Sequence, residues 1–218
     1  MSTENLTHIL FSKWQRTLEP FGVDQIAADK AFNHLVAAYS SSDRYYHTLK
    51  HIHHVLSTIE ILHGYTNNLA AVLFAGWFHD VVYDTKAQDN EEKSADYAFD
   101  LLSHLGIPES TIATVSRLIL NTKNHQAAAD DCDSQVLLDA DLAVLATNPV
   151  DYPEYSDAIR QEYAWVLQAE YIAGRRQFLE GFLQRSIYFT PLMLEFAEPF
   201  ARSNIQEEIK SLTSGYGF

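Results

Sequence analysis

Apolar residues recur along this chain at the three- and four-residue intervals of an α-helix. Residues 3–18 and 24–39 both follow this spacing, and Asp24 precedes the second segment as a residue type that caps helices. No segment shows the strict alternation of apolar and polar residues that is typical of a half-buried strand. The pattern predicts an all-α protein, a helical bundle of roughly eight to ten helices.

The remaining helices are predicted from the same periodicity together with Asn, Gly and Pro signals between segments. Residues 124–134 are polar and are expected to form a loop. We expect one domain over 1–218, with a core at about 40–146 and a C-terminal helical extension at about 150–213. The expected helices are 44–63, 69–80, one from a capping box at 89–92 to Gly106, one from Pro108 to about 122, 134–146, 153–186 with a bend near Gly174, and one from Pro191.

Composition narrows the range of partners. With 218 residues, of which 47% are hydrophobic, the chain can bury a substantial core. A net charge of −14 disfavours nucleic-acid polymers and anionic membrane surfaces as partners. The longest apolar run, 69–78, is too short to cross a bilayer, and no leader is evident. We expect a soluble, cytoplasmic protein that acts on a small molecule and is compatible with a homodimer.

The single cysteine, Cys132, excludes an intramolecular disulfide and a zinc cluster built from thiolates. It also fits a reducing compartment. Any metal site in this chain must therefore be built mainly from histidine and carboxylate ligands.

The dipeptide His79-Asp80 directly follows the apolar run 69–78. An ionised carboxylate at the end of a core helix is costly to remove from water, and it adds to the negative end of the helix dipole. A bound cation would answer both problems. On this dipeptide alone, an exposed aspartate beside a hydrogen-bonded histidine remains the alternative.

A second candidate segment, 46–54, is rich in histidine. If it is helical, His47, His51 and His54 share one face, opposite the apolar residues, whereas His53 belongs to neither face. Histidines one turn apart on a covered face can converge on one site. Simple polar packing of the same side chains is the competing interpretation.

A third segment, 136–145, places Asp139 and Asp141 inside another apolar stretch. Carboxylates are rarely buried without a partner, and a spacing of two puts these two on different faces of a helix. Asp141 has leucines on its own side and is the more inward candidate, with Asp139 as an alternative.

Together these segments resemble the HD-domain superfamily of metal-dependent phosphohydrolases, which is named for its ordered His, His-Asp and Asp pattern. The matching residues, and so the metal ligands that the resemblance implies, are His51, His79, Asp80 and Asp141. The implied fold is an HD-domain-like helical bundle.

Two narrower resemblances add detail. The segment from Tyr46-His47 to His51 is similar to one of cyclic nucleotide phosphodiesterases, in which a Tyr-His pair precedes the ligand histidine by one turn. Over about 40–205 the chain resembles bacterial predicted metal-dependent HD phosphohydrolases, a group that brings no particular substrate with it. The motifs are Arg44-Tyr-Tyr-His47, Trp77-Phe-His-Asp-Val-Val-Tyr-Asp84, Asp89-Asn-Glu91, Thr122-Lys-Asn-His125 and Leu138-Asp-Ala-Asp-Leu142.

The implied chemistry follows from the ligand types. Imidazole and carboxylate donors suit a divalent Mn, Fe, Co, Ni, Zn or Mg ion, which would activate water for attack on a phosphorus atom. The expected function is hydrolysis of a phosphomonoester or phosphodiester of a small molecule, such as a nucleotide. By the phosphodiesterase-like match, His47 would protonate the leaving oxygen; its alternative role is to orient His51.

Four further residues are weaker candidates, and three of them have a structural alternative. Glu91 could orient the attacking water, but an acid in a first helical turn is already explained by the helix dipole. Lys123, His125 and Arg160 could contact the substrate, whereas a surface ion pair would also explain Arg160, and an exposed loop would explain His125. Most of the C-terminal arginines are assigned to surface pairs: Arg175, Arg176, Arg185 and Arg202.

Two classes of function remain from the sequence. The first is the metal-dependent phosphohydrolase. The alternative is a metal- or nucleotide-binding regulatory module without turnover. The complete ligand set favours the enzyme, because a decayed site would be expected to lose a ligand.

Overall fold

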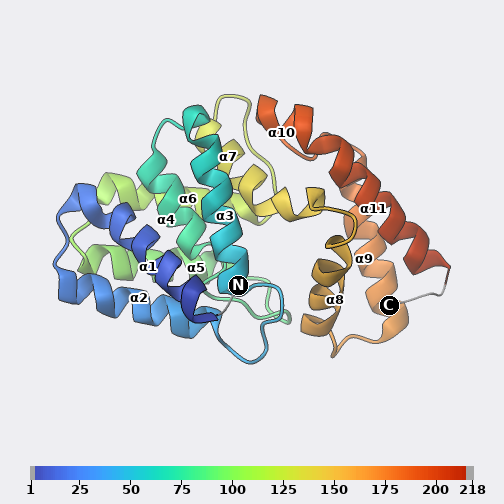
Figure 1. Cartoon of the computed structure of the whole chain (residues 1–218), viewed down its shortest axis with the longest axis horizontal. Helices are drawn as coiled ribbons and strands as arrows, with labels where there is room; N and C mark the ends of the chain where they lie inside the picture. Colours follow the sequence, from blue (N-terminus) through green and yellow to red (C-terminus); the bar gives the residue numbers. More distant parts are fainter. Residues whose placement is uncertain (1–2, 215–218) are drawn as a thin grey trace. The chain divides into compact units, whose positions relative to one another are not determined.

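The structure is a computed structural model that describes residues 3–214. Within this range all regular elements are helices, eleven α-helices and three short 3-10 helices (Figure 1). The predicted all-α class is confirmed. The helices outnumber the expectation slightly because two of the predicted C-terminal helices are each divided.

The chain separates into two compact units, Met1–Leu138 and Asp139–Phe218. The division falls inside one helix, α7 (Cys132–Asp141). We describe each unit by itself. The expectation of a single domain with a C-terminal extension stays a prediction.

The first unit is built around α4, a helix that is apolar on all sides. Seven of its ten residues are buried, and it packs against α3 and α6. From α1, Trp14 makes an edge-to-face contact with Trp77 of α4, with ring centroids 5.5 Å apart. The helices of this unit are α1 (Thr3–Leu18), α2 (Gln25–Tyr39), α3 (Leu49–Leu62), α4 (Leu69–Phe78), α5 (Asn90–His104) and α6 (Glu109–Thr122), with 3-10 helices at Glu19–Phe21 and His63–Tyr65.

Several helix ends follow the sequence signals. The Asp24 side chain accepts hydrogen bonds from the N–H groups of Ile26 and Ala27 and caps α2. Gly106 follows α5 with a φ of 74°, a left-handed conformation that glycine adopts without steric cost. These short-range signals act through neighbouring residues, so the sequence alone is enough to read them.

One predicted helix start is wrong, and one predicted capping box is absent although its helix begins where expected. The helix expected from residue 44 begins at Leu49, because the Thr48 hydroxyl accepts the N–H of Lys50 and caps α3 there. The capping box expected at 89–92 does not form. Asp89 makes no side-chain cap hydrogen bond and instead pairs with Lys93 at 2.8 Å.

The predicted long helix over 153–186 is also wrong, and so is its bend near Gly174. The chain leaves the helical conformation at 163–167, and Gly174 lies inside the second of the two resulting helices. Arg160 holds this break, since it donates hydrogen bonds to the carbonyl oxygens of Tyr163 and Val166. The second unit contains the 3-10 helix Leu142–Ala146, α8 (Tyr152–Glu162), α9 (Gln168–Leu183), α10 (Pro191–Phe196) and α11 (Glu198–Thr213).

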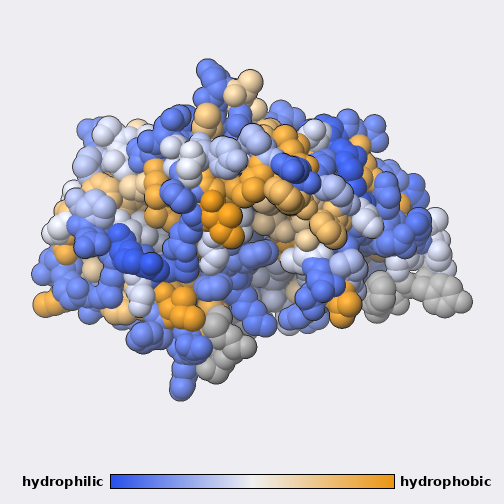
Figure 2. Space-filling model, turned by 45° about the horizontal axis from the view of Figure 1, so that its top comes forward, coloured by the Kyte–Doolittle hydropathy of each residue, from blue (hydrophilic) through white to orange (hydrophobic). Residues whose placement is uncertain are grey.

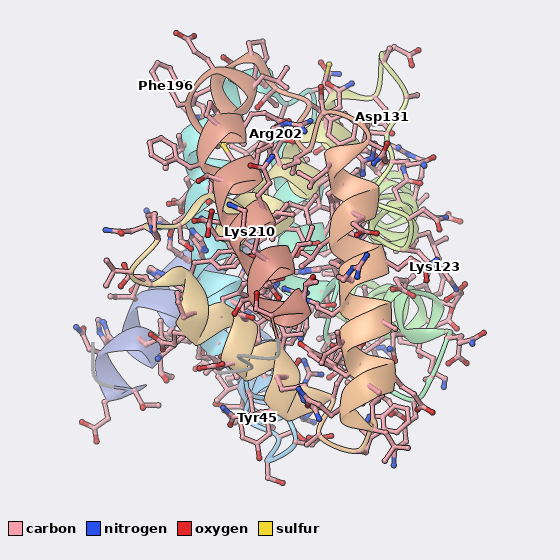
Figure 3. The ribbon with its side chains drawn as sticks, turned by 90° about the vertical axis from the view of Figure 1, so that its right-hand side faces the viewer. Tyr45, Lys123, Asp131, Phe196, Arg202 and Lys210 are labelled. Atoms are coloured by element: carbon pink, nitrogen blue, oxygen red, sulfur yellow. The ribbon has the colours of Figure 1, made fainter. Side chains whose placement is uncertain are left out.

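Arg175 departs from the expectation of surface arginine pairs. It is buried in the second unit and donates to the buried carboxylate of Glu208 at 2.8 Å. Desolvation lowers the pKa of Arg175, but Tyr155 and Glu208 outweigh it and raise the pKa well above its ordinary value. Arg176 and Arg202 do form the predicted pairs, each with a glutamate one turn away. Arg202 and Lys210 lie along α11 (Figure 3).

The face of the molecule drawn in Figure 2 is mostly hydrophilic and is interrupted by apolar patches. Charged residues make up 20% of the chain, which agrees with a hydrophilic face. Among the residues that the structure describes, none of the helices combines the length and the apolar character needed to span a bilayer.

Candidate metal centre

Two buried histidines meet at one end of α4. His51 lies in the first turn of α3 and His79 directly follows α4, and they are 4% and 2% exposed. Their Nε2 atoms are 3.2 Å apart. The Oδ2 atom of Asp80 lies 3.0 Å from Nε2 of His79 and 3.4 Å from Nε2 of His51. The predicted convergence of these three residues is therefore present within the first unit.

A main-chain contact sets the tautomer of His79. Its Nδ1 lies 3.2 Å from the carbonyl oxygen of Gly76, which can only accept a hydrogen bond. Nδ1 therefore carries a proton. Nε2 faces His51 and Asp80; it donates to Asp80 when the ring is an imidazolium, and it would offer its lone pair to a metal ion once that proton is released. This is the arrangement in which a histidine can coordinate a metal ion.

The histidines around Asp80 stabilise its ionised carboxylate. Burial raises the pKa of Asp80, but the charges of His79 and His47 and hydrogen bonds from His51 and His79 outweigh it. The pKa of the carboxyl therefore lies well below its ordinary value. Asp80 is an anion at neutral pH, as a metal ligand must be.

The donor set fits a divalent metal ion. His51, His79 and Asp80 each offer a ligand atom, and these atoms lie within 4.8 Å of one another. Two imidazole nitrogens and a carboxylate oxygen are ligands that zinc, manganese, iron, cobalt and nickel share. The three residues form a candidate metal centre in the first unit.

His47 does not lie on the helix, contrary to the prediction that it shares a helical face with His51. It belongs to the turn before Thr48, and from there its Nε2 lies 3.9 Å from Oδ2 of Asp80. Its ring also lies on that of Tyr83, with centroids 4.0 Å apart. The turn thus places His47 at the edge of the candidate metal centre. The 3.6-residue spacing of a helix does not predict this position, because His47 is not helical.

Arg44 and Tyr83 are the residues that sequence reasoning missed. The Arg44 guanidinium is buried and donates to the carbonyl oxygens of His47, Asp80 and Val81. Both residues do stand in the motifs that carry the family resemblance, at the start of one and near the end of another. That position was the available signal, but composition and periodicity give it no chemical meaning.

The two aspartates of α7 reverse the expected order of burial. Asp139 is completely buried, whereas Asp141, the last residue of α7, is half-buried. The Asp139 carboxylate accepts hydrogen bonds from the N–H groups of Phe189 and Thr190 and from the Thr190 hydroxyl. Asp139 thus has a structural role within the second unit. The pattern of leucines did not predict that Asp139 is more buried than Asp141.

Three of the weaker candidates, Lys123, His125 and Arg160, have different surroundings. Lys123 follows α6 and is paired with Glu92 at 2.5 Å and with Glu91 at 4.0 Å. His125 is in the loop beyond α6, with a φ of 47°. In the second unit, Arg160 hydrogen bonds Gln168 and two main-chain carbonyls and lies over the ring of Tyr171.

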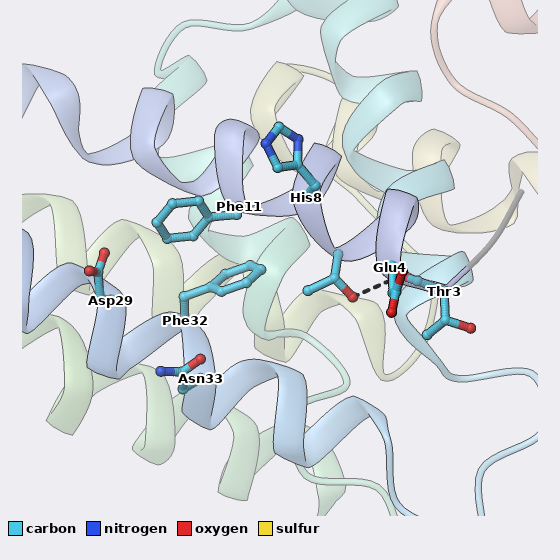
Figure 4. Close-up of a pocket in the computed structure, with 8 residues that line it drawn as sticks. Thr3, Glu4, His8, Phe11, Asp29, Phe32 and Asn33 are labelled. Atoms are coloured by element: carbon cyan, nitrogen blue, oxygen red, sulfur yellow. Dashed lines mark hydrogen bonds between the residues drawn. The ribbon is translucent and has the colours of Figure 1, made fainter.

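A hollow of about 560 Å³ lies between α1 and α2 (Figure 4). The aromatic pair Phe11 and Phe32 lines it, with His8 and Asp29 nearby. None of the predicted site residues takes part in it. The chemistry predicted from the sequence therefore belongs to the end of α4 and not to this hollow.

Comparison with known proteins gives a likeness of fold. No protein-family model matches the chain, and no curated protein matches it. Among solved structures, the chain is similar to the phosphodiesterase domain of Salpingoeca rosetta rhodopsin phosphodiesterase, with a TM-score of 0.66 and 15% sequence identity. The match covers 98% of this chain and 88% of that domain. At this identity the likeness concerns the fold, which is that of a helical phosphodiesterase domain.

Proposed function

We propose that this chain is a metal-dependent hydrolase that cleaves a phosphomonoester or phosphodiester of a small molecule, such as a nucleotide. The observation that carries the proposal is the convergence of His51, His79 and Asp80 on one buried point. The fold likeness to a phosphodiesterase domain is consistent with it.

The proposed metal ligands are His51, His79, Asp80 and Asp141. The proposal for Asp141 rests on its place in the ordered motif, and it is supported by the hydrogen bonds that the competing carboxylate of Asp139 accepts from Phe189 and Thr190. A divalent Mn, Fe, Co, Ni, Zn or Mg ion bound there would supply an activated water and would polarise the phosphoryl group.

The other proposed roles belong to side chains of the protein. When water adds to phosphorus and the P–O bond of the ester breaks, the oxygen of a poor leaving group must gain a proton. We assign its delivery to His47, whose Nε2 is 3.9 Å from the Asp80 carboxylate and so at the edge of the metal centre. Glu91 would orient the water, and Lys123 and His125 would contact the phosphate.

These secondary roles have unequal support. The ammonium group of Lys123 already neutralises Glu92, so it would have to exchange partners to bind a phosphate. The donors of Arg160 are committed to the break between α8 and α9, and its proposed substrate contact rests only on its charge. The proposal depends on the three converging residues of the first unit and not on these contacts.

The test is a phosphate-release screen over phosphorylated metabolites, run with several divalent metals and complemented by bis-p-nitrophenyl phosphate as a diester probe. Wild type is compared with Asp80→Ala and with the matched control Asp84→Ala, which removes an exposed carboxylate four residues away. We expect Asp80→Ala to lose both metal and hydrolysis and Asp84→Ala to keep both. Hydrolysis that persists in metal-free Asp80→Ala would overturn the proposal.

The same experiment separates the enzyme from its alternative. A regulatory module would bind stoichiometric metal but hydrolyse none of the substrates in the screen. A protein that binds no divalent metal, even after supplementation, would contradict the metal-dependent enzyme and the metal-binding module alike.

A further inference from the structure

Arg44 is the buried cation closest in the chain to the candidate metal centre, and its partners are unusual. Arg44 is 9% exposed, and in the described part of the chain its guanidinium group donates hydrogen bonds to main-chain carbonyls. Removing a guanidinium from water is costly and is normally offset by a carboxylate. A buried arginine that is satisfied by carbonyl oxygens instead fixes main-chain geometry.

The three carbonyls belong to two separate segments. The Nη1 atom donates to His47 at 3.1 Å and to Asp80 at 2.7 Å, while Nη2 donates to Val81 at 2.9 Å. The first segment is the turn before α3, and the second is the turn after α4. Arg44 therefore joins the turn that carries His47 to the turn that carries Asp80.

The need for this link follows from where Asp80 lies. Helix α4 ends at Phe78, and the Phe78 carbonyl is already bound by the N–H of Val81. The carbonyls of Asp80 and Val81 thus lie beyond the helix, where no helical hydrogen bond can orient them. A cation just past the C-terminal end of a helix is also favoured by the helix dipole.

Two aromatic rings keep the guanidinium in place. Its central carbon lies 5.0 Å from the ring of Tyr39 and 5.6 Å from the ring of Tyr83. The hydroxyl of Tyr39 donates in turn to the carbonyl oxygen of Trp77, in the last turn of α4. Tyr83 contacts the ring of His47 as well. Arg44 is thus the centre of a packed group around both turns.

We propose that Arg44 is a positioning residue that sets the metal affinity of the centre by holding the main chain of Asp80 against the turn of His47. The inference rests on the proposed metal-dependent function. A planar fork with several fixed donors is needed to reach two segments at once, and the single ammonium group of lysine cannot replace it.

The test measures binding of Mn²⁺ to the chelator-treated full chain, with free Mn²⁺ followed by electron paramagnetic resonance. The variants are Arg44→Lys, which keeps a cation, and Arg44→Met, which keeps only the apolar stem. Outer partners of metal ligands typically contribute about 10- to 100-fold to affinity, and we expect a loss in this range for both variants. Circular dichroism at the assay temperature establishes that each variant is folded.

Lys13→Met is the matched control. Lys13 is a cation of the same unit that is buried to a similar extent, but its partner is Glu60. We expect this variant to lose stability and to bind Mn²⁺ as wild type does. If Arg44→Lys binds Mn²⁺ with wild-type affinity, or loses no more affinity than Lys13→Met, Arg44 is not a positioning residue.

Failure of the proposed function has a different signature. In that case wild type itself binds no Mn²⁺, Zn²⁺ or other divalent ion, and this inference falls with it. If Arg44→Met does not fold, Arg44→Lys decides the outcome, because it retains the charge and most of the side-chain volume.

Discussion

The Nε2 atoms of His51 and His79 face each other at 3.2 Å, although 28 positions separate the two residues in the chain. Each histidine stands at the end of a different core helix, and the adjacent Asp80 carboxylate completes the contact. A divalent ion between these atoms would replace the contact between the two Nε2 atoms with metal–ligand bonds.

We therefore expect metal to stabilise the fold. Added Mn²⁺ or Zn²⁺ at a hundredfold excess over its dissociation constant should raise the free energy of unfolding by about 2.7 kcal/mol, because only the folded chain presents the assembled ligands. Differential scanning calorimetry with and without chelator measures the shift in melting temperature. The same shift in Asp80→Ala would show that the ion binds elsewhere.

His47 is expected to act in turnover and not in metal binding. In His47→Gln, we predict a loss of about 100- to 10,000-fold in kcat for esters with a poor leaving group, the usual range for a lost general acid. Esters that release p-nitrophenolate need no proton and should lose far less. Metal affinity, measured in parallel, should not change. A parallel fall in metal affinity would instead make His47 a residue that orients or supplements the ligands.

The close approach of α3 and α4 depends on Gly76. A Cβ atom at this position would lie 2.8 Å from Cδ1 of Ile59 and 3.3 Å from Cδ2 of Leu56. We predict that Gly76→Ala destabilises the protein by about 1–3 kcal/mol, the usual cost of overpacking, and that urea unfolding will measure it. Because α3 and α4 carry His51 and His79, metal affinity should fall as well.

The control for this substitution is Gly174→Ala, at a helical position in α9 where an added Cβ meets no atom within 4 Å. Alanine should stabilise the helix there by up to about 1 kcal/mol. If Gly76→Ala raises the free energy of unfolding as Gly174→Ala is expected to do, the packing between α3 and α4 does not control the stability of the first unit.

Asp139 should make stability depend on pH. Burial raises its pKa from 3.8 to about 6, despite hydrogen bonds from Thr190 and Phe189. Between these values the folded carboxyl holds a proton that the unfolded chain has released, so rising pH favours unfolding. The free energy of unfolding should therefore fall between about pH 4 and pH 6 by about 3 kcal/mol from this group and then level off.

Urea unfolding of the chelator-treated protein across this range measures the effect. The variant Asp139→Asn cannot titrate, so the difference in slope between it and wild type isolates the contribution of Asp139. Equal slopes in the two proteins would mean that Asp139 does not titrate in this window.

The helices that the sequence predicted well are those whose signals are local. Residues 3–18 form α1 as expected, and Asp24 caps α2 through hydrogen bonds to residues two and three positions away. The predicted helices that were wrong, 44–63 and 153–186, both run through segments without a strong breaker. There the chain is held by Thr48 and by the bonds of Arg160 to carbonyls, which helical periodicity does not encode.

The sequence by itself determined the all-α class, because apolar periodicity is a property of neighbouring residues, and its resemblance to the ordered His, His-Asp pattern pointed to the three residues that converge in the first unit. Only the tertiary structure decided how Asp139 and Arg44 are used. Asp139 binds a segment 50 positions away, and Arg44 reaches across 36 positions to Asp80. Such contacts depend on which helix ends meet in space, and a single sequence does not state those pairings.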